Sequence, residues 1–217
     1  MLKIKTPTTY PISQLFGNPA KMYTDLGYKG HNGIDFGCPT GTPIVACYDG
    51  FVEYTGEDGS GGIGVYVIHP ELNLRSIYWH FKNYTVKVGD KVKQGDILGI
   101  SDNTGFSFGA HLHFGLKKIE KRGNVWVIPY DPSGWNGNID PFDMLDFYNI
   151  KGNWKRGTTK GIWVKKIQEL LNRKGAKLKI DGLFGKKTEK AIKDFQTKVG
   201  LKSDGVVGSK TWAKLLE

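Results

Sequence analysis

The stretch Gly109–Gly115 reads "GAHLHFG" and places two histidines one residue apart, in a chain of 217 residues that has only five. In an extended strand, residues two apart point to the same face, so His111 and His113 are expected to project together. Leu112 and Phe114 then point to the other side, where apolar burial would fix the strand. The pattern predicts a strand that turns two imidazoles toward a cleft.

A second pair of polar residues lies upstream, in "GHNGIDFG" (30–37). His31 and Asp35 are four apart, so they also share a face in an extended chain. A helix would align them too, but Gly33 and the β-branched Ile34 disfavour a helix. Catalytic zinc sites use three protein ligands, typically imidazole nitrogens and carboxylate oxygens, and leave one position for water. Two histidines and one aspartate fit that pattern, whereas the helical His-Glu-x-x-His signature is absent.

Short β-type runs broken by glycine fill the first two thirds of the sequence. Segments 63–70 and 74–81 are strand-like, and the Gly-Asp pairs at 89–90 and 95–96 have the composition of turns. Closely spaced strands with turn signals predict an antiparallel sheet. We therefore expect an α+β protein whose residues 1–148 form a mainly antiparallel β domain with a groove.

The periodicity of the sequence changes after a polar, basic and glycine-containing stretch that we interpret as a linker over 149–160. Apolar residues then recur at helical spacing in three runs, which predicts a small three-helix domain over 161–217. Gly175 and Gly200 follow the first two runs and are expected to end those helices. Within this region "DGLFGKKT" (181–188) and "DGVVGSKT" (204–211) share five of eight residues, which favours a duplicated helix–loop unit.

Charge is distributed unevenly along the chain. Residues 1–150 hold 13 Lys and Arg against 15 Asp and Glu, whereas residues 151–217 hold 18 against 6. The second region is therefore expected to meet a polyanion, either a nucleic acid or an anionic bacterial wall. No apolar run is long enough for a membrane span or a signal peptide, so we expect synthesis in the cytoplasm. Two cysteines are too few for a disulfide framework and are expected to be buried thiols.

Four separated segments together resemble a known enzyme family. The segments "GHNGIDFGCPTGTPIVACYDGFVEYTG", "IYWHF", "VKVGDKVKQGDILGIS" and "NTGFSFGAHLHFG" follow one another as in the lysostaphin-type zinc endopeptidases that cut bacterial peptidoglycan. The resemblance covers about residues 12–146. It implies that His31, Asp35 and His113 bind one Zn²⁺ and that His80 and His111 are catalytic. Zinc lowers the pKa of its water toward 7, and which histidine takes the proton from that water stays open.

The basic C-terminal region is similar to the small peptidoglycan-binding domain of many wall hydrolases, over about residues 165–217. The chain lacks an aromatic-interleaved basic strand or a recognition-helix motif, so we expect peptidoglycan and anionic wall polymers as partners and no nucleic acid. These resemblances imply a monomeric zinc endopeptidase that cleaves cross-links or stem peptides. We expect a phage endolysin, made in the host cytoplasm and released to the wall through a holin pore. A bacterial autolysin of the same chemistry, or a non-enzymatic wall-binding scaffold, is the alternative.

Overall fold

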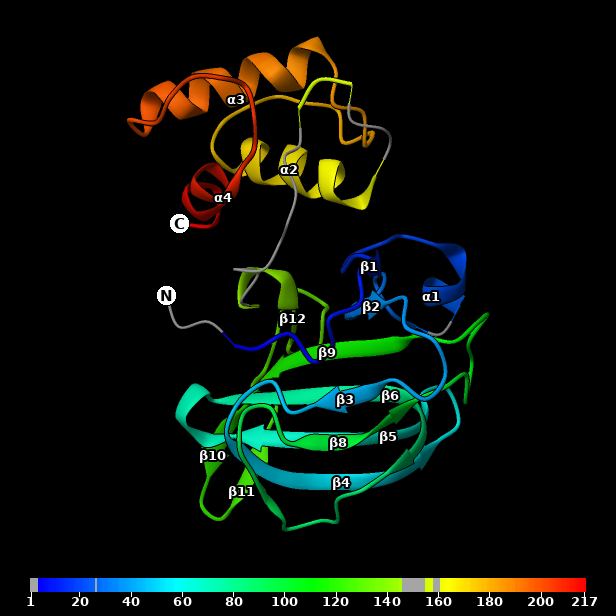
Figure 1. Ribbon diagram of the computed structural model, residues 1–217. Helices are drawn as coiled ribbons and strands as arrows, with labels where there is room; N and C mark the ends of the chain where they lie inside the picture. Colours follow the sequence, from blue (N-terminus) through cyan, green and yellow to red (C-terminus); the bar gives the residue numbers. More distant parts are fainter. Residues whose placement is uncertain (1–3, 26, 146–154, 158–160) are drawn as a thin grey trace. The chain divides into compact units, whose positions relative to one another are not determined.

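The computed structural model describes residues 4–25, 27–145, 155–157 and 161–217 (Figure 1). The chain divides into two compact units, residues 2–146 and residues 147–217, and each is described by itself. Most of the linker expected at 149–160 lies outside the described residues. The boundaries at 148 and 161 therefore stay predictions.

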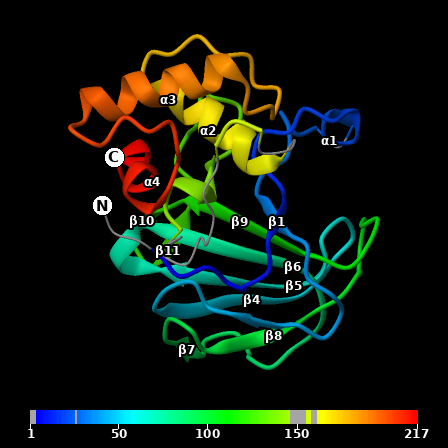
Figure 2. The same cartoon turned by 45° about the horizontal axis from the view of Figure 1, so that its top comes forward.

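The first unit is built around an antiparallel β-sheet, and Figure 2 shows its central strands side by side. The strands follow the order β1-β2-β9-β6-β5-β4-β7, while β12 pairs with β9 and β8 pairs with both β3 and β6. The hairpin β10-β11 is separate from this sheet. The elements of the unit are β1 Ile12–Gln14, α1 Lys21–Asp25, β2 Ile34–Phe36, β3 Pro43–Val45, β4 Gly50–Asp58, β5 Gly62–His69, η1 Pro70–Leu72, β6 Leu74–Tyr84, β7 Lys91–Val92, β8 Ile97–Ser101, β9 Leu112–Lys118, β10 Glu120–Arg122, β11 Val125–Val127, β12 Asn138–Ile139 and η2 Pro141–Asp143.

Side-chain alternation along β9 separates the core from the site. Leu112, Phe114 and Leu116 are fully buried, and Phe114 packs against Phe36 and Tyr78. Residues of odd number on β9 point to the other face, and His113 is one of them. The expected antiparallel β domain is confirmed, since every pairing inside the sheet is antiparallel.

The glycine-containing turns set the ends of several strands. Gly89 and Gly95 have positive φ angles, which glycine adopts without steric cost, so the turns expected there are confirmed. Asp90 and Asp96 close these turns by accepting hydrogen bonds from the backbone three residues earlier. The β-type runs on either side of Asp49 do not pair with each other: β3 pairs with β8, and β4 pairs with β5 and β7.

The second unit contains three helices within residues 161–217, as expected from the apolar periodicity: α2 Ile162–Arg173, α3 Lys186–Lys198 and α4 Ser209–Leu216. Gly175 and Gly200 follow α2 and α3 with φ angles of +99° and +73°, the left-handed conformation that commonly ends a helix. The core holds apolar side chains from all three helices. In the described part of the chain, no helix combines the length and apolarity that crossing a membrane requires.

The sequence repeat corresponds to a repeated network of hydrogen bonds. In the first copy, Gln168 donates from Nε2 to the carboxylate of Asp181 at 2.9 Å, and its Oε1 accepts from the amide of Gly182 at 2.9 Å. In the second copy, Gln196 makes the same two bonds with Asp204 and Gly205, both at 2.9 Å. Buried polar groups need such partners, so each glutamine of one helix fixes the loop before the next helix.

Candidate metal centre

The site lies in an open cavity of about 380 Å³ on the first unit. Its walls come from the segment around α1, the β4–β5 turn, the end of β6 and the loop before β9. The cavity is lined by Ser13, Gln14, Met22, Tyr23, Tyr28, His31, Asn32, Asp35, Gly37, Ser60, Gly61, Trp79, His80, Phe106, Ser107, Phe108, Gly109, Ala110, His111 and His113. Four of the five histidines therefore gather in one cavity, although they are up to 82 residues apart in the sequence.

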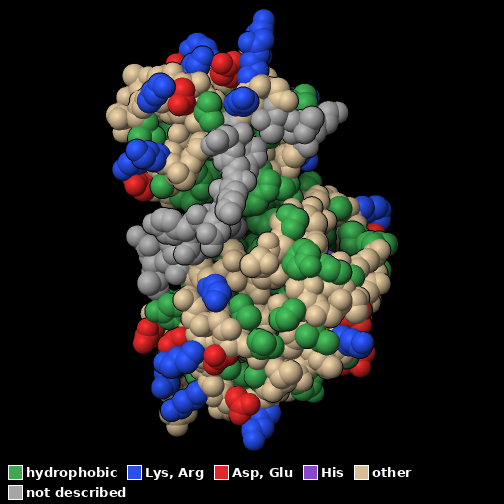
Figure 3. Space-filling view, in the orientation of Figure 1, with side chains coloured by type: hydrophobic (Ala, Val, Ile, Leu, Met, Phe, Trp, Pro, Cys, Tyr) green, Lys and Arg blue, Asp and Glu red, His purple; other side chains and the backbone are tan. Residues whose placement is uncertain are grey.

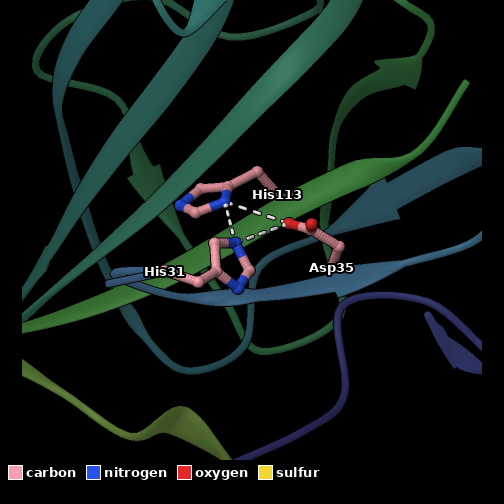
Figure 4. A group of neighbouring side chains, drawn as sticks. All are labelled: His31, Asp35 and His113. Carbon is pink, nitrogen blue, oxygen red and sulfur yellow. Dashed lines mark hydrogen bonds and ion pairs between the residues drawn. The ribbon is translucent and has the colours of Figure 1, made fainter. Parts of the chain in front are cut away.

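Strand pairing brings two of the predicted ligands together. In the register of β2 and β9, Asp35 is the direct partner of His113; both residues line the cavity, and their side chains point toward each other (Figure 4). The Oδ1 atom of Asp35 lies 3.0 Å from Nδ1 of His113 and 3.0 Å from Nε2 of His31. The two imidazole nitrogens are themselves 3.0 Å apart. The three predicted metal ligands thus form one compact and nearly buried triangle.

His31 reaches this triangle from a loop rather than from a strand, because β2 begins only at Ile34. Gly33 makes the approach possible: a Cβ atom there would lie 2.5 Å from the backbone oxygen of Phe114. The even spacing of His31 and Asp35 correctly predicted a shared direction, but the extended conformation expected for the whole segment is confirmed only from residue 34.

A hydrogen bond to the backbone fixes which nitrogen of His31 faces the other ligands. Nδ1 of His31 donates to the carbonyl oxygen of Leu15 at 3.0 Å, so its Nε2 lone pair is left for a ligand. His113 is turned the other way, with Nδ1 toward Asp35. The bond from His31 to Leu15 is of the kind that usually orients a metal-binding histidine.

The donor set fits a zinc ion. Two imidazole nitrogens and one carboxylate oxygen are typical zinc ligands, and all lie within 4.8 Å of one another. Donor atoms bound about 2.1 Å from one tetrahedral ion lie roughly 3.4 Å apart, close to the distances of 3.0 Å found here. Burial alone would raise the pKa of Asp35, but hydrogen bonds and charge from His113 and His31 hold that pKa well below its usual range. The carboxylate is therefore ionised, as a metal ligand must be.

His111 stands at the edge of the triangle. It precedes β9 and is joined to Asp102 by an isolated antiparallel bridge. Its Nδ1 donates to the carbonyl oxygen of Gly109 at 2.8 Å and lies 3.1 Å from the hydroxyl of Ser107. Its Nε2 therefore faces the cavity, 3.7 Å from Oδ1 of Asp35. The side chain is partly exposed, so it can contact a molecule that enters the cavity.

His80 enters the cavity through an unusual backbone conformation. Trp79 pairs with His113 and points to the cavity face, so strict alternation along β6 would send His80 to the core. Instead His80 has a φ angle of +68°, and both residues line the cavity. Left-handed backbone at a non-glycine residue is strained and is often found at functional sites.

The surroundings of His80 also fix its ring. Nδ1 donates to the carbonyl oxygen of Thr104 at 2.7 Å, and the ring centroid lies 4.4 Å from that of His111. Burial, followed by the charge of His111, lowers the pKa of His80 to about 4. A neutral His80 with Nδ1 engaged presents Nε2 as a hydrogen-bond acceptor.

Aromatic side chains form walls that the sequence did not identify as part of a site. Trp79 lies against Gly61 and Gly64, where an added Cβ would come within 2.4 and 2.0 Å of its ring. Phe106 and Phe108 contact each other and are exposed at the rim. The sequence feature nearest to this wall is the glycine-rich run "GSGGIG" at 59–64, which spans the turn between β4 and β5 and the start of β5.

A tyrosine on α1 is a second residue that sequence reasoning missed. Tyr23 lines the cavity, stacks 5.2 Å from the ring of His31 and receives a hydrogen bond from the amide of Gln14. Burial and then the charge of Asp35 raise the pKa of its hydroxyl. No sequence motif identified Tyr23, because its approach to the ligands depends on how the chain places α1 beside His31.

The fifth histidine and both cysteines lie elsewhere. His69 is fully buried, donates from Nδ1 to the carbonyl oxygen of Asp49 at 2.9 Å and lies 2.7 Å from the hydroxyl of Ser76. Cys38 and Cys47 are free and buried, as expected. Neither thiol is among the side chains that line the cavity. Neither thiol is therefore placed to act as a nucleophile in this cavity.

Comparison with known proteins gives matches to both units. Residues 29–125 match peptidase family M23, and residues 161–215 match the family described as a peptidoglycan binding domain. The peptidoglycan DD-endopeptidase ShyC of Vibrio cholerae is 38% identical over 98 residues, which are 45% of this chain and 22% of that protein. Lysostaphin of Staphylococcus simulans is 42% identical over 92 residues, which are 41% of this chain and 19% of that protein.

A solved structure shows the same likeness in three dimensions. The structure of lysostaphin, the antimicrobial peptidase from Staphylococcus simulans, superimposes with a TM-score of 0.53 at 30% sequence identity. The match covers 69% of this chain and 53% of that one. The chain spans about a fifth of the length of the curated relatives that it matches.

Proposed function

Because this chain carries an M23 peptidase domain followed by a peptidoglycan-binding domain, we propose that it is a zinc-dependent endopeptidase that cleaves cross-links or stem peptides of bacterial peptidoglycan. The observation that carries the proposal is the triangle of His31, Asp35 and His113, with His80 and His111 beside it in one cavity. A non-enzymatic scaffold would need none of these five side chains to converge. The likeness to a DD-endopeptidase and to lysostaphin supports a peptide bond of the wall as the substrate.

The residues of the cavity have complementary roles in this proposal. A zinc ion held by the triangle would supply Lewis acidity toward a peptide carbonyl and an acidified water. His111, whose Nε2 faces the cavity, would take a proton at that atom from an attacking water and return it to the leaving amine. His80 orients the water through Nε2, because Thr104 occupies its other nitrogen. Trp79 and the two rim phenylalanines offer apolar surface for the substrate beside the reacting bond.

Digestion of purified peptidoglycan by the full chain tests this function. We expect new amino groups in the soluble products and no new reducing sugar ends, and mass spectrometry of the fragments identifies the bond. A zinc chelator should reduce the rate by about a thousandfold or more, and added Zn²⁺ should restore it. Release of reducing ends alone, or full activity in the presence of the chelator, would contradict the proposal.

The second unit is proposed to hold the enzyme near anionic wall polymers as well as peptidoglycan. Residues 161–217 hold 14 Lys and Arg against 6 Asp and Glu, and Figure 3 shows basic side chains over the visible face of this unit. All six acidic side chains already bond within the unit: four pair with lysine or arginine, and Asp181 and Asp204 accept hydrogen bonds from the glutamines of α2 and α3. The remaining positive charge attracts polyanions, and this attraction weakens as salt is added.

A biological setting is proposed from the pairing of a wall-cutting unit with a wall-binding unit. We propose that the chain acts as a monomeric phage endolysin, made in the host cytoplasm and released to the wall through a holin. A bacterial autolysin of the same chemistry is the alternative. A holin gene beside the coding sequence would favour the endolysin, whereas a chromosomal neighbourhood of wall-synthesis genes would favour the autolysin.

A further inference from the structure

The two Asp-Gly loops of the second unit have the same internal bonding. The first loop, Leu178–Thr188, and the second, Leu201–Thr211, are identical at seven of eleven positions. Besides the bonds already described, Gln168 donates to the backbone oxygen of Leu183 at 3.1 Å. Gln196 donates to the equivalent oxygen, that of Val206, at 3.0 Å. The central glycines, Gly182 and Gly205, have φ angles of +75° and +74°. The second loop is therefore an internal reference for what the fold requires.

Four positions differ between the loops, and three of them are exposed in the first. Ile180 and Leu183 have exposed fractions of 49% and 44%, and they are the exposed large apolar side chains found in residues 161–217. The second loop has the smaller Ser203 and Val206 at these positions. The fourth difference is at Phe184, which is buried and belongs to the core. Since the second loop keeps the same bonds without them, the fold does not require the two exposed apolar residues.

The third exposed difference is a positive charge. Lys186 begins α3, whereas Ser209 occupies the equivalent position at the start of α4. The first turn of a helix favours acidic over basic residues, so helix stability does not account for this lysine. Neither Lys186 nor its neighbour Lys187 forms an ion pair with a residue that the structure describes. The first loop therefore presents two exposed apolar side chains, and the first turn of α3 directly after it presents two lysines.

We propose that the first Asp-Gly loop, through Ile180, Leu183 and Lys186, is the surface of the second unit that contacts the stem peptides of peptidoglycan. Stem peptides carry methyl side chains and free carboxylates, which match apolar and cationic groups side by side. Glycan strands are a poorer match, because three of the four aromatic residues in 161–217 are buried and the fourth, Trp163, is only partly exposed. A phosphodiester polymer would use the lysines but gain nothing from the apolar pair. This inference rests on the wall-binding role proposed above.

A loop transplant tests the inference without risk to the fold. The triple variant Ile180→Ser, Leu183→Val and Lys186→Ser gives the first loop the residues that the second loop already holds. It is made in the full chain on the His111→Ala background, so that the wall is not digested during the measurement. Binding is measured by co-sedimentation with sacculi stripped of wall polymers. We expect the apparent Kd to rise roughly tenfold, as for the loss of central contact residues.

Two controls separate this loop from general effects. Lys198→Ser removes the same charge from the exposed end of α3, and we expect less than a twofold change in Kd. Ser203→Ile with Val206→Leu alters the second loop instead and should also leave Kd unchanged. Equal binding by the triple variant and its parent would overturn the inference, as would retention of the parent only by sacculi that keep their phosphodiester polymers.

Activity distinguishes failure of this inference from failure of the proposed function. With His111 restored, the triple variant should cleave a small soluble muropeptide at the parental rate, because the loop is not part of the catalytic cavity. If the parent cleaves such a muropeptide but does not bind stripped sacculi, the inference is overturned while the endopeptidase assignment stands. If neither protein cleaves it, the proposed function itself is wrong.

Discussion

The His113→Ala variant is expected to lose its bound metal and its peptidase activity together. This substitution removes one of three protein ligands and leaves only His31 and Asp35, whose side chains cannot hold the ion alone. Peptidoglycan turnover should fall by about a thousandfold or more, and metal analysis should find much less than one zinc ion per chain. His113 pairs with Asp35 across β2 and β9, so the fold of the variant is checked against chelator-treated parent protein by circular dichroism and thermal unfolding.

Lys118→Ala is a matched control for this experiment. Lys118 lies on the same strand, is exposed and does not line the cavity. It should keep both zinc and activity. A full complement of zinc in His113→Ala would show that other side chains hold the metal, and the ligand set would then be wrong.

The His111→Ala variant is expected to keep its zinc and lose most of its turnover. The Nε2 atom of His111 lies 3.7 Å from Asp35, outside the triangle of ligands, and faces the cavity as a proton acceptor. Loss of a general base typically costs about a hundredfold to ten-thousandfold in rate. Metal content and turnover are measured on the same preparation, so the two effects are separated directly.

Ser107→Ala provides the comparison for His111. Its hydroxyl lies 3.1 Å from Nδ1 of His111, but the carbonyl oxygen of Gly109 accepts from the same nitrogen at 2.8 Å. Removing the hydroxyl should therefore cost far less activity than removing the imidazole. Near-parental wall lysis by His111→Ala would refute the role assigned to that histidine.

Much of the site could be predicted because it follows from strand geometry. The spacing of His31 and Asp35 indicated a shared direction, and the alternation of Leu112, His113 and Phe114 separated core from cavity. The resemblance to a known family then supplied the roles of His80 and His111. Short-range periodicity and the glycine turns were likewise sufficient for the sheet and for the three helices of the second unit.

The rest depended on long-range contacts that no local pattern contains. The left-handed backbone of His80 reverses the alternation of β6 and could not be deduced from "IYWHF". Tyr23 lies on α1 and Phe108 in the segment before β9, and both reach the cavity through contacts between segments far apart in the sequence. In the second unit, the repeat was visible in the sequence, but the glutamines that fix it lie on the preceding helices, 13 and 8 residues away from their aspartates.

The central claim is that His31, Asp35 and His113 hold one zinc ion, and diffraction at the zinc absorption edge tests it most directly. Crystals of the zinc-loaded full chain should give a single anomalous peak in the cavity, within bonding distance of Nε2 of His31, Oδ1 of Asp35 and Nδ1 of His113. A peak bound instead by His80 and His111, or no peak in the cavity of an active preparation, would contradict the account.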